Sequence, residues 1–201
     1  MYRKIFLAAV TTCLVVLGAN VCAAGTFQMI YNAENFTGNM SSNEAVDETF
    51  NTDYGKFRLQ LRKLANASAD KRIHVIIERD KERVYDEHFP EVLYGYTFRA
   101  FKNTADNRQF YLIQSINRAI VIGWSPVNNK IETYIDSQNY YHAEHSAPNV
   151  VATKKGDLVM GFESPSLTAS ARYVFTWDAK KLWFAYADLG TYSYPVSRDS
   201  Q

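Results

Sequence analysis

Short apolar stretches separated by turn residues recur through most of this sequence, and that rhythm restricts the chain to a β fold. Segments such as "RQFYLIQS" and "AIVIGW" recur about every eight to twelve residues, and polar loops such as "KNTADN" and "SPVNN" join them. β-Branched and aromatic residues favour strands, whereas Asn, Asp, Pro and Gly favour turns. Long helical periods and βαβ spacing are lacking, so the pattern predicts an antiparallel all-β domain.

The pattern predicts an antiparallel meander of about 8–10 strands, counted by turn spacing. The expected strands cover residues 26–31, 57–62, 73–80, 93–101, 108–115, 119–124, 130–136, 156–163, 171–177 and 182–188. A helix is an alternative at Phe57–Leu64, where apolar residues also recur at helical spacing. The polar stretch 32–55 is expected to be a loop, with a short helix near 43–50 as an option because Ser41 and Glu44 have capping-box spacing.

Two of the expected strands are apolar on both alternating faces. They are Ala119–Trp124 and Leu182–Ala187. A strand with one wet face alternates between apolar and polar residues, so these two strands need cover on both sides. A curved sheet, a filled barrel, a sandwich and a partial propeller all provide such cover.

A hairpin-like unit occurs twice. The tract from Trp124 to Tyr141 and the tract from Trp177 to Tyr194 both contain a Trp, a turn with Lys and an apolar strand ending in Tyr-x-Asp. The strand period of two places Tyr134 with Asp136 on one face of the first unit. We therefore predict an internal duplication in which an aromatic hairpin packs against the preceding unit.

The first 24 residues have the layout of a secretory signal peptide. A short basic region, Met1–Lys4, precedes an uncharged and mostly apolar run, and Ala23 and Ala24 supply the small residues of a cleavage site. A retained transmembrane anchor is the alternative, since the run is close to the length that spans a bilayer. The expected organisation is a signal peptide at 1–24, an acidic loop-rich segment at 25–55 and a single β-rich domain at 56–201.

Cysteine usage narrows the chemistry. Both cysteines, Cys13 and Cys22, lie in the leader, so the mature chain has no thiol. Disulfides, cysteine nucleophiles and thiolate metal sites are therefore excluded for it. A secreted or periplasmic location is expected, and an exported domain without disulfides is typical of a bacterial protein.

Charge and motifs exclude several partners. The segment 25–55 carries five acidic and no basic residues, and a basic stretch follows it, but the whole chain has a net charge of only +1. A concentrated basic footprint is missing, and so are phosphate-loop and dinucleotide motifs. Nucleic acid, nucleotides and cofactors are not expected, and contact with a membrane is expected only through an uncleaved leader.

Three sets of residues are candidates for function. Asp136 and Asp188 could form the carboxylate pair of a secreted hydrolase, although capping of the turn after each strand explains them better. His142 and His145 are the candidate metal ligands, but they lack the spacing of the helical His-Glu-x-x-His motif, and an ordinary polar loop explains them better. His74 lies within an expected strand and is interpreted as a core or face residue.

Aromatic side chains near turns and strand ends are the third set. The chain contains 14 Tyr, 12 Phe and 3 Trp, and exposed rings on a rigid sheet can anchor a partner. The candidate binding residues are Trp124, Tyr140, Tyr141, Trp183, Tyr192 and Tyr194, although filling of the core is the better explanation for each ring, because large aromatic side chains are usually buried. We therefore expect an exported, non-catalytic module that binds an envelope component, a glycan or a protein. A hydrolase, or a structural component joined to its neighbours by strand edges, is the alternative.

Overall fold

Strands account for most of the computed structural model, which describes residues 25–33, 45–140, 147–163 and 170–192. The described strands are β1 (Phe27–Ala33), β2 (Ala45–Thr52), β3 (Gly55–Lys63), β4 (Ile73–Arg79), β5 (Glu82–Phe89), β6 (Thr97–Asn103), β7 (Gln109–Gln114), β8 (Ala119–Ser125), β9 (Lys130–Asp136), β10 (Ala147–Ala152), β11 (Asp157–Glu163), β12 (Ser170–Asp178) and β13 (Trp183–Tyr192). Two short 3-10 helices, η1 (Ala69–Lys71) and η2 (Ser137–Asn139), are added to them.

The strands form three antiparallel sheets. The N-terminal sheet has the order β2-β3-β4-β5, the middle sheet β1-β6-β7-β8-β9 and the C-terminal sheet β10-β11-β12-β13. Nearly all neighbouring strands follow one another in the chain and are joined as hairpins. The exception is β1, which pairs with β6.

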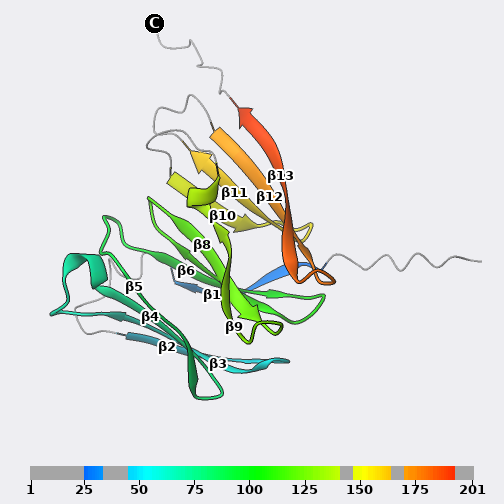
Figure 1. Cartoon of the computed structure of the whole chain (residues 1–201). Coiled ribbons are helices and arrows are strands. Elements are labelled where there is room, and N and C mark those ends of the chain that lie inside the picture. Colours follow the sequence, from blue (N-terminus) through cyan, green and yellow to red (C-terminus); the bar gives the residue numbers. More distant parts are fainter. Residues whose placement is uncertain (1–24, 34–44, 141–146, 164–169, 193–201) are drawn as a thin grey trace, which may run out of the picture.

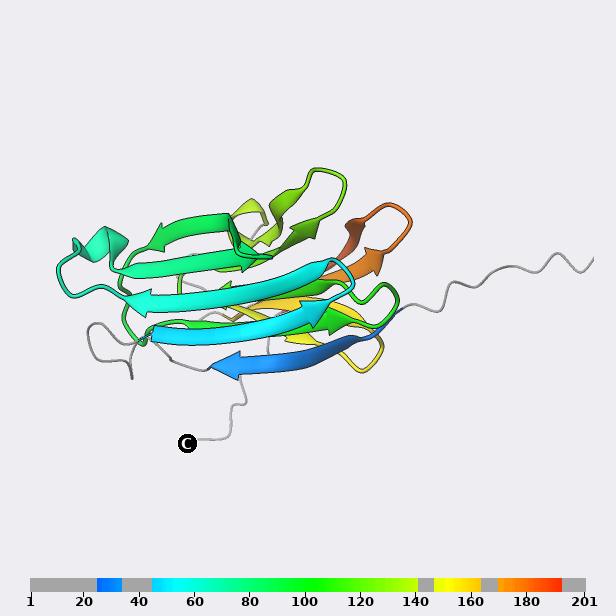
Figure 2. The same ribbon diagram turned by 90° about the horizontal axis from the view of Figure 1, so that it is seen from below.

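The three sheets are stacked, with the middle sheet between the other two (Figure 1). Two apolar cores lie on its opposite faces. Phe110, Leu112 and Val121 face the core shared with the C-terminal sheet. Tyr111 and Ile122 face the core shared with the N-terminal sheet. Figure 2, seen from below, looks onto the outer face of the N-terminal sheet.

The all-β, hairpin-built fold class is confirmed, and the described sheets form no closed barrel. The prediction of cover on both faces holds for β8, in which every residue is buried. It is wrong for Leu182–Ala187, because β13 is an edge strand of an outer sheet. Trp183 is 47% exposed and Tyr186 is 61% exposed.

Thirteen described strands exceed the expected 8–10, because β2, β5 and β10 were not expected. The loop or helix expected around residues 43–50 is wrong from Ala45 onward, where β2 pairs in register with β3. That pairing crosses residue 55, the expected boundary of the acidic segment. Asp47 of β2 accepts a hydrogen bond from the Arg58 guanidinium of β3, Nε to Oδ1, at 2.8 Å.

The two repeated tracts form the last hairpin of the middle sheet and the last hairpin of the C-terminal sheet. They meet in one core, where the Tyr134 ring packs on the rings of Trp177 and Phe184. The two tryptophans nevertheless face different cores, since Trp124 lies in the core on the other side. Trp124 and Trp177 are 53 residues apart, whereas Tyr134 and Tyr186 are 52 residues apart, so the two copies differ by one residue between the Trp and the Tyr. One such residue exchanges the faces of a strand, which explains the difference.

A buried arginine at the β6–β7 turn links the three layers. Arg108 is 1% exposed, and its guanidinium carbon lies 4.9 Å from the ring centre of Trp177 in the C-terminal sheet. On the other side it lies 5.2 Å from the ring centre of Tyr54 in the β2–β3 turn. Asp106, in the same turn as Arg108, accepts a hydrogen bond from the Trp177 indole nitrogen at 2.9 Å. The planar cation therefore joins both cores at one end of the inner strands β6 and β7 of the middle sheet.

Candidate functional site

The outer face of the C-terminal sheet is apolar along its centre. Strand pairing aligns Val151 with Val159, Val159 with Val174 and Val174 with Ala187. Their chain neighbours, such as Leu158 and Phe175, are buried in the inner core. Because successive strand residues point to opposite faces, the aligned valines and Ala187 lie on the outer face.

This apolar row is open to solvent in the described residues. Val151 is 43% exposed, Ala187 is exposed, and Val159 and Val174 are half-buried. Polar groups border the row on one side, where the Thr176 hydroxyl donates to the Asp157 carboxylate at 2.6 Å. The described residues thus leave a continuous apolar row across all four strands in contact with solvent.

The outer face of the N-terminal sheet has the opposite character. One of its cross-strand rows consists of Asp47, Gln60, Ile76 and Asp86. Arg58, in the adjoining row, bonds to carboxylates on both neighbouring strands, Asp47 and Glu78. The molecule thus has one outer face crossed by charged rows and another crossed by a single apolar row.

The apolar row ends at β13, which pairs with β12 on one side and with no described strand on the other. Three large side chains of this ten-residue edge strand are exposed, namely Trp183, Tyr186 and Leu189. The Trp183 ring packs on Tyr134 with ring centres 4.9 Å apart, and the Tyr186 ring packs on Tyr140 at 5.5 Å. These rings are held in place while part of their surface faces solvent.

The predicted aromatic residues are placed differently from one another. Trp183 lies on the exposed edge just described, and Tyr140 is half-buried beneath Tyr186. Burial raises the pKa of the Tyr140 hydroxyl, and the neighbouring Tyr186 adds to the shift, so this ring acts as a neutral contact. Trp124 is 4% exposed and packs between Phe57 and the Arg79 guanidinium.

The other predicted aromatic residues and the histidine cluster are not placed. Tyr141 and Tyr194 lie outside the described residues, and so do the candidate metal ligands His142 and His145. Tyr192 is the last residue of β13, and its side chain is not described.

The two candidate carboxylates cap the backbone, as the sequence favoured. Asp136 accepts a hydrogen bond from the Gln138 amide at 3.1 Å, and Asp188 accepts one from the Gly190 amide at 2.7 Å. Asp136 is also held by the Arg118 guanidinium, Nε to Oδ1 at 3.1 Å. Burial pushes the pKa of Asp136 up, but these hydrogen bonds outweigh it and hold the pKa below its usual value. Asp136 is therefore an ion-paired anion, which suits capping better than proton transfer.

Sequence reasoning missed the apolar row because three of its four members are ordinary strand valines. Only the strand register, which aligns them across four strands, reveals the strip. The alternation of Val159 and Val174 with buried neighbours was the available signal, but it needs the pairing partners to be known.

No protein-family model, curated protein or solved structure matches this chain. Among the described residues, no helix has the length and apolar character needed to cross a membrane.

Proposed function

We propose that this chain is an exported, non-catalytic binding module that docks a partner protein on the outer face and free edge of its C-terminal sheet. The observation that carries the proposal is the apolar row Val151–Val159–Val174–Ala187, which continues to the unpaired edge of β13. Export rests on the leader at residues 1–24, and N-terminal sequencing of the mature protein tests it.

The chemistry of this surface favours a protein over a glycan. Sugar sites combine flat aromatic faces with several polar groups that bond the hydroxyls, whereas this strip is lined by small aliphatic side chains. The free edge of β13 offers backbone donors and acceptors along ten residues. An extended segment of a partner can add to such an edge as a further strand, with its side chains on the apolar face.

The test is photocrosslinking from a reactive amino acid placed at Val174, in cells that produce the protein. A matched probe is placed at Thr49, which is exposed on the outer face of the charged N-terminal sheet. The expected result is one defined protein adduct from Val174 and none from Thr49. Adding Val159→Lys to the Val174 probe should abolish the adduct, since a charge at the centre of an apolar contact is costly to bury.

Two outcomes contradict the proposal. One is a Val174 adduct that persists with Val159→Lys while the variant keeps its native circular dichroism, because contact through the row is then not required. The other is a protein that forms no protein adduct but co-sediments with insoluble peptidoglycan or another polysaccharide, to the same extent with and without Val159→Lys. A Val174 adduct with a second copy of the chain would instead identify the partner as the protein itself.

A further inference from the structure

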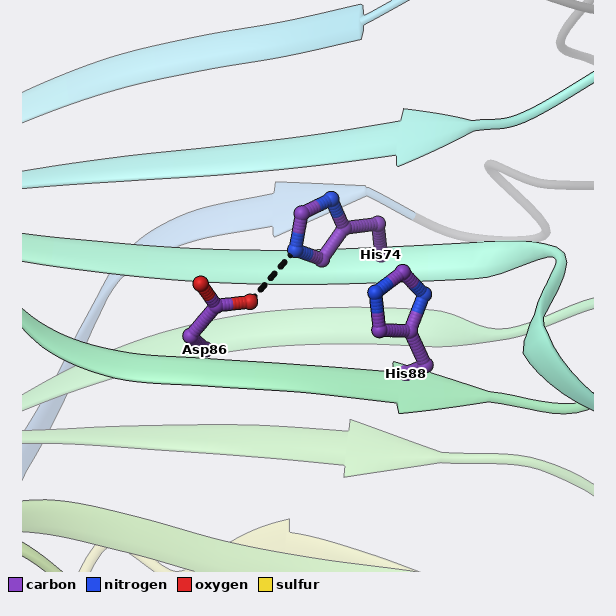
Figure 3. A group of neighbouring side chains, drawn as sticks. All are labelled: His74, Asp86 and His88. Atoms are coloured by element: carbon purple, nitrogen blue, oxygen red, sulfur yellow. Dashed lines mark hydrogen bonds and ion pairs between the residues drawn. The ribbon is translucent and has the colours of Figure 1, made fainter.

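The outer face of the N-terminal sheet holds two histidines and an aspartate that belong to neighbouring strands (Figure 3). His74 lies on β4, and Asp86 and His88 lie on β5. Pairing places His74 directly opposite His88 and places Asp86 opposite Ile76, the residue two positions along the strand. Side chains at such positions in neighbouring strands come within contact distance.

A bulge in the β4–β5 hairpin creates this arrangement. The two strands turn at Asp80 and Lys81, both with positive φ (50° and 76°), as a tight two-residue hairpin turn requires. Beyond the turn the register shifts by one residue between Ile77 and Glu78, so β5 carries one extra residue, Val84. Without that extra residue, Glu87 would lie opposite His74 and His88 would point to the other face.

The possible ligand atoms converge on one point above the sheet. One nitrogen of each ring and one carboxylate oxygen lie within 4.8 Å of one another. The two imidazole rings are parallel, with centres 4.1 Å apart and planes inclined by 7°. His74 Nε2 lies 2.6 Å from Asp86 Oδ1.

Neighbouring groups fix the chemical state of these ligands. His88 Nδ1 lies 3.0 Å from the Lys71 carbonyl oxygen, which can only accept, so Nδ1 carries the proton and Nε2 is left with its lone pair. Such a carbonyl contact to the outer nitrogen is typical of metal-bound histidines. The second oxygen of Asp86 accepts from Arg83 Nη1 at 2.6 Å. The contacts with His74 and Arg83 thus hold both oxygens of the Asp86 carboxylate in place on the outer face.

We propose that His74, Asp86 and His88 bind one divalent transition-metal ion of the zinc type. Two imidazole nitrogens and one carboxylate oxygen form the ligand set that suits zinc, copper and nickel, whereas calcium and magnesium prefer oxygen ligands alone. Three protein ligands leave a coordination position for water or for a group of a partner.

The competing explanation is an Asp–His ion pair with a second ring stacked on it and no metal. Such a pair needs only His74 and Asp86. This explanation gives no role to the contact between His88 Nδ1 and the Lys71 carbonyl oxygen. That contact leaves Nε2 of His88 as the nitrogen with a free lone pair. The two explanations differ in whether His88 matters for metal affinity, and the experiment therefore centres on that residue.

The test is isothermal titration of the purified mature protein with Zn²⁺, and with Mg²⁺ as a second probe. One zinc site is expected, with no binding of Mg²⁺ in the same range. His88→Gln and Asp86→Asn should each weaken zinc binding by at least about 100-fold, more than the 10–100-fold loss typical for a supporting partner. Both changes lie on exposed positions of an edge strand, and circular dichroism with a thermal melt checks that each variant is folded.

Two control variants keep the proposal falsifiable. Asp47→Asn removes another carboxylate from the same face and should leave zinc affinity unchanged. The double replacement His142→Ala and His145→Ala removes the other histidine pair of the chain and should also leave it unchanged. The proposal is overturned if the native protein does not bind zinc, if folded His88→Gln binds as tightly as the native protein, or if the double replacement abolishes binding.

Discussion

Leu112→Ala and Ile122→Ala test the stacking of three sheets most directly. The two residues belong to neighbouring strands of the middle sheet and are both 0% exposed. Leu112 faces the core shared with the C-terminal sheet, and Ile122 faces the core shared with the N-terminal sheet. Truncation of a fully buried Leu or Ile to Ala costs about 2–5 kcal/mol, from lost burial and from the cavity left behind. We expect both replacements to reach this range.

Urea denaturation followed by tryptophan fluorescence measures the effect. Trp177 lies in the first core and Trp124 in the second, so each core has its own reporter. With an m-value of about 2 kcal/mol/M, a loss of 3 kcal/mol lowers the urea midpoint by about 1.5 M. Val174→Ala, on the outer face of the C-terminal sheet, is the control and should cost below about 1 kcal/mol.

The two cores also predict additivity. Leu112→Ala combined with the milder Ile122→Val should give the sum of the single effects within about 0.5 kcal/mol, because the two side chains belong to different clusters. A cost below about 1 kcal/mol for either Leu112→Ala or Ile122→Ala would mean that one face of the middle sheet is not packed. The three-layer arrangement would then be refuted.

Three further predictions concern single polar groups. Arg108→Lys should lower the unfolding free energy by about 1–3 kcal/mol, because an ammonium cannot stack between Tyr54 and Trp177 as the guanidinium does; an unchanged urea midpoint would contradict this. Burial raises the pKa of Tyr96 to about 12, so the folded state holds the phenolic proton more tightly and stability falls as pH rises from about 10 towards 12. The cost of Tyr96→Phe in urea titrations should therefore be smaller at pH 11 than at pH 9, and equal costs would show that Tyr96 does not cause the loss. The lowered pKa of Asp136 gives stability that is present at neutral pH and is lost as pH falls below about 4. Asp136→Asn should therefore reduce the slope with which the unfolding free energy falls in acid. An unchanged slope would mean that other groups cause the loss of stability in acid.

The strands that sequence analysis missed share one physical property. β2 and β5 are the two edges of the N-terminal sheet, and β10 is an edge of the C-terminal sheet. An edge strand is covered less than a central one, so its sequence can be polar, as "ERVYDEHF" is, or can contain a proline, as "APNVVA" does with Pro148. Periodicity finds strands by their buried face, and it therefore finds central strands first.

The sites depended on register, which one sequence does not determine. The apolar row of Val151, Val159, Val174 and Ala187 requires three strand pairings, and the grouping of His74 with His88 requires the bulge at Val84. In contrast, the capping roles of Asp136 and Asp188 are local, because each acceptor bonds an amide two residues later. Those roles were predicted from the sequence alone.

The pairing of β1 with β6 has a consequence for how the chain reaches its final state. Within each of the segments 45–89, 97–136 and 147–192, the described strands pair with the strands next to them in the chain, so each group can assemble as soon as it is made. β1 is made before all of them, yet its partner β6 begins at Thr97. We therefore expect the first strand to dock late and to form the only pairing between described strands that are not consecutive in the chain. Until then the open edge of β6 offers a place where the first strand of another molecule can bind instead, and this is the point at which exchange of strands between two chains would begin.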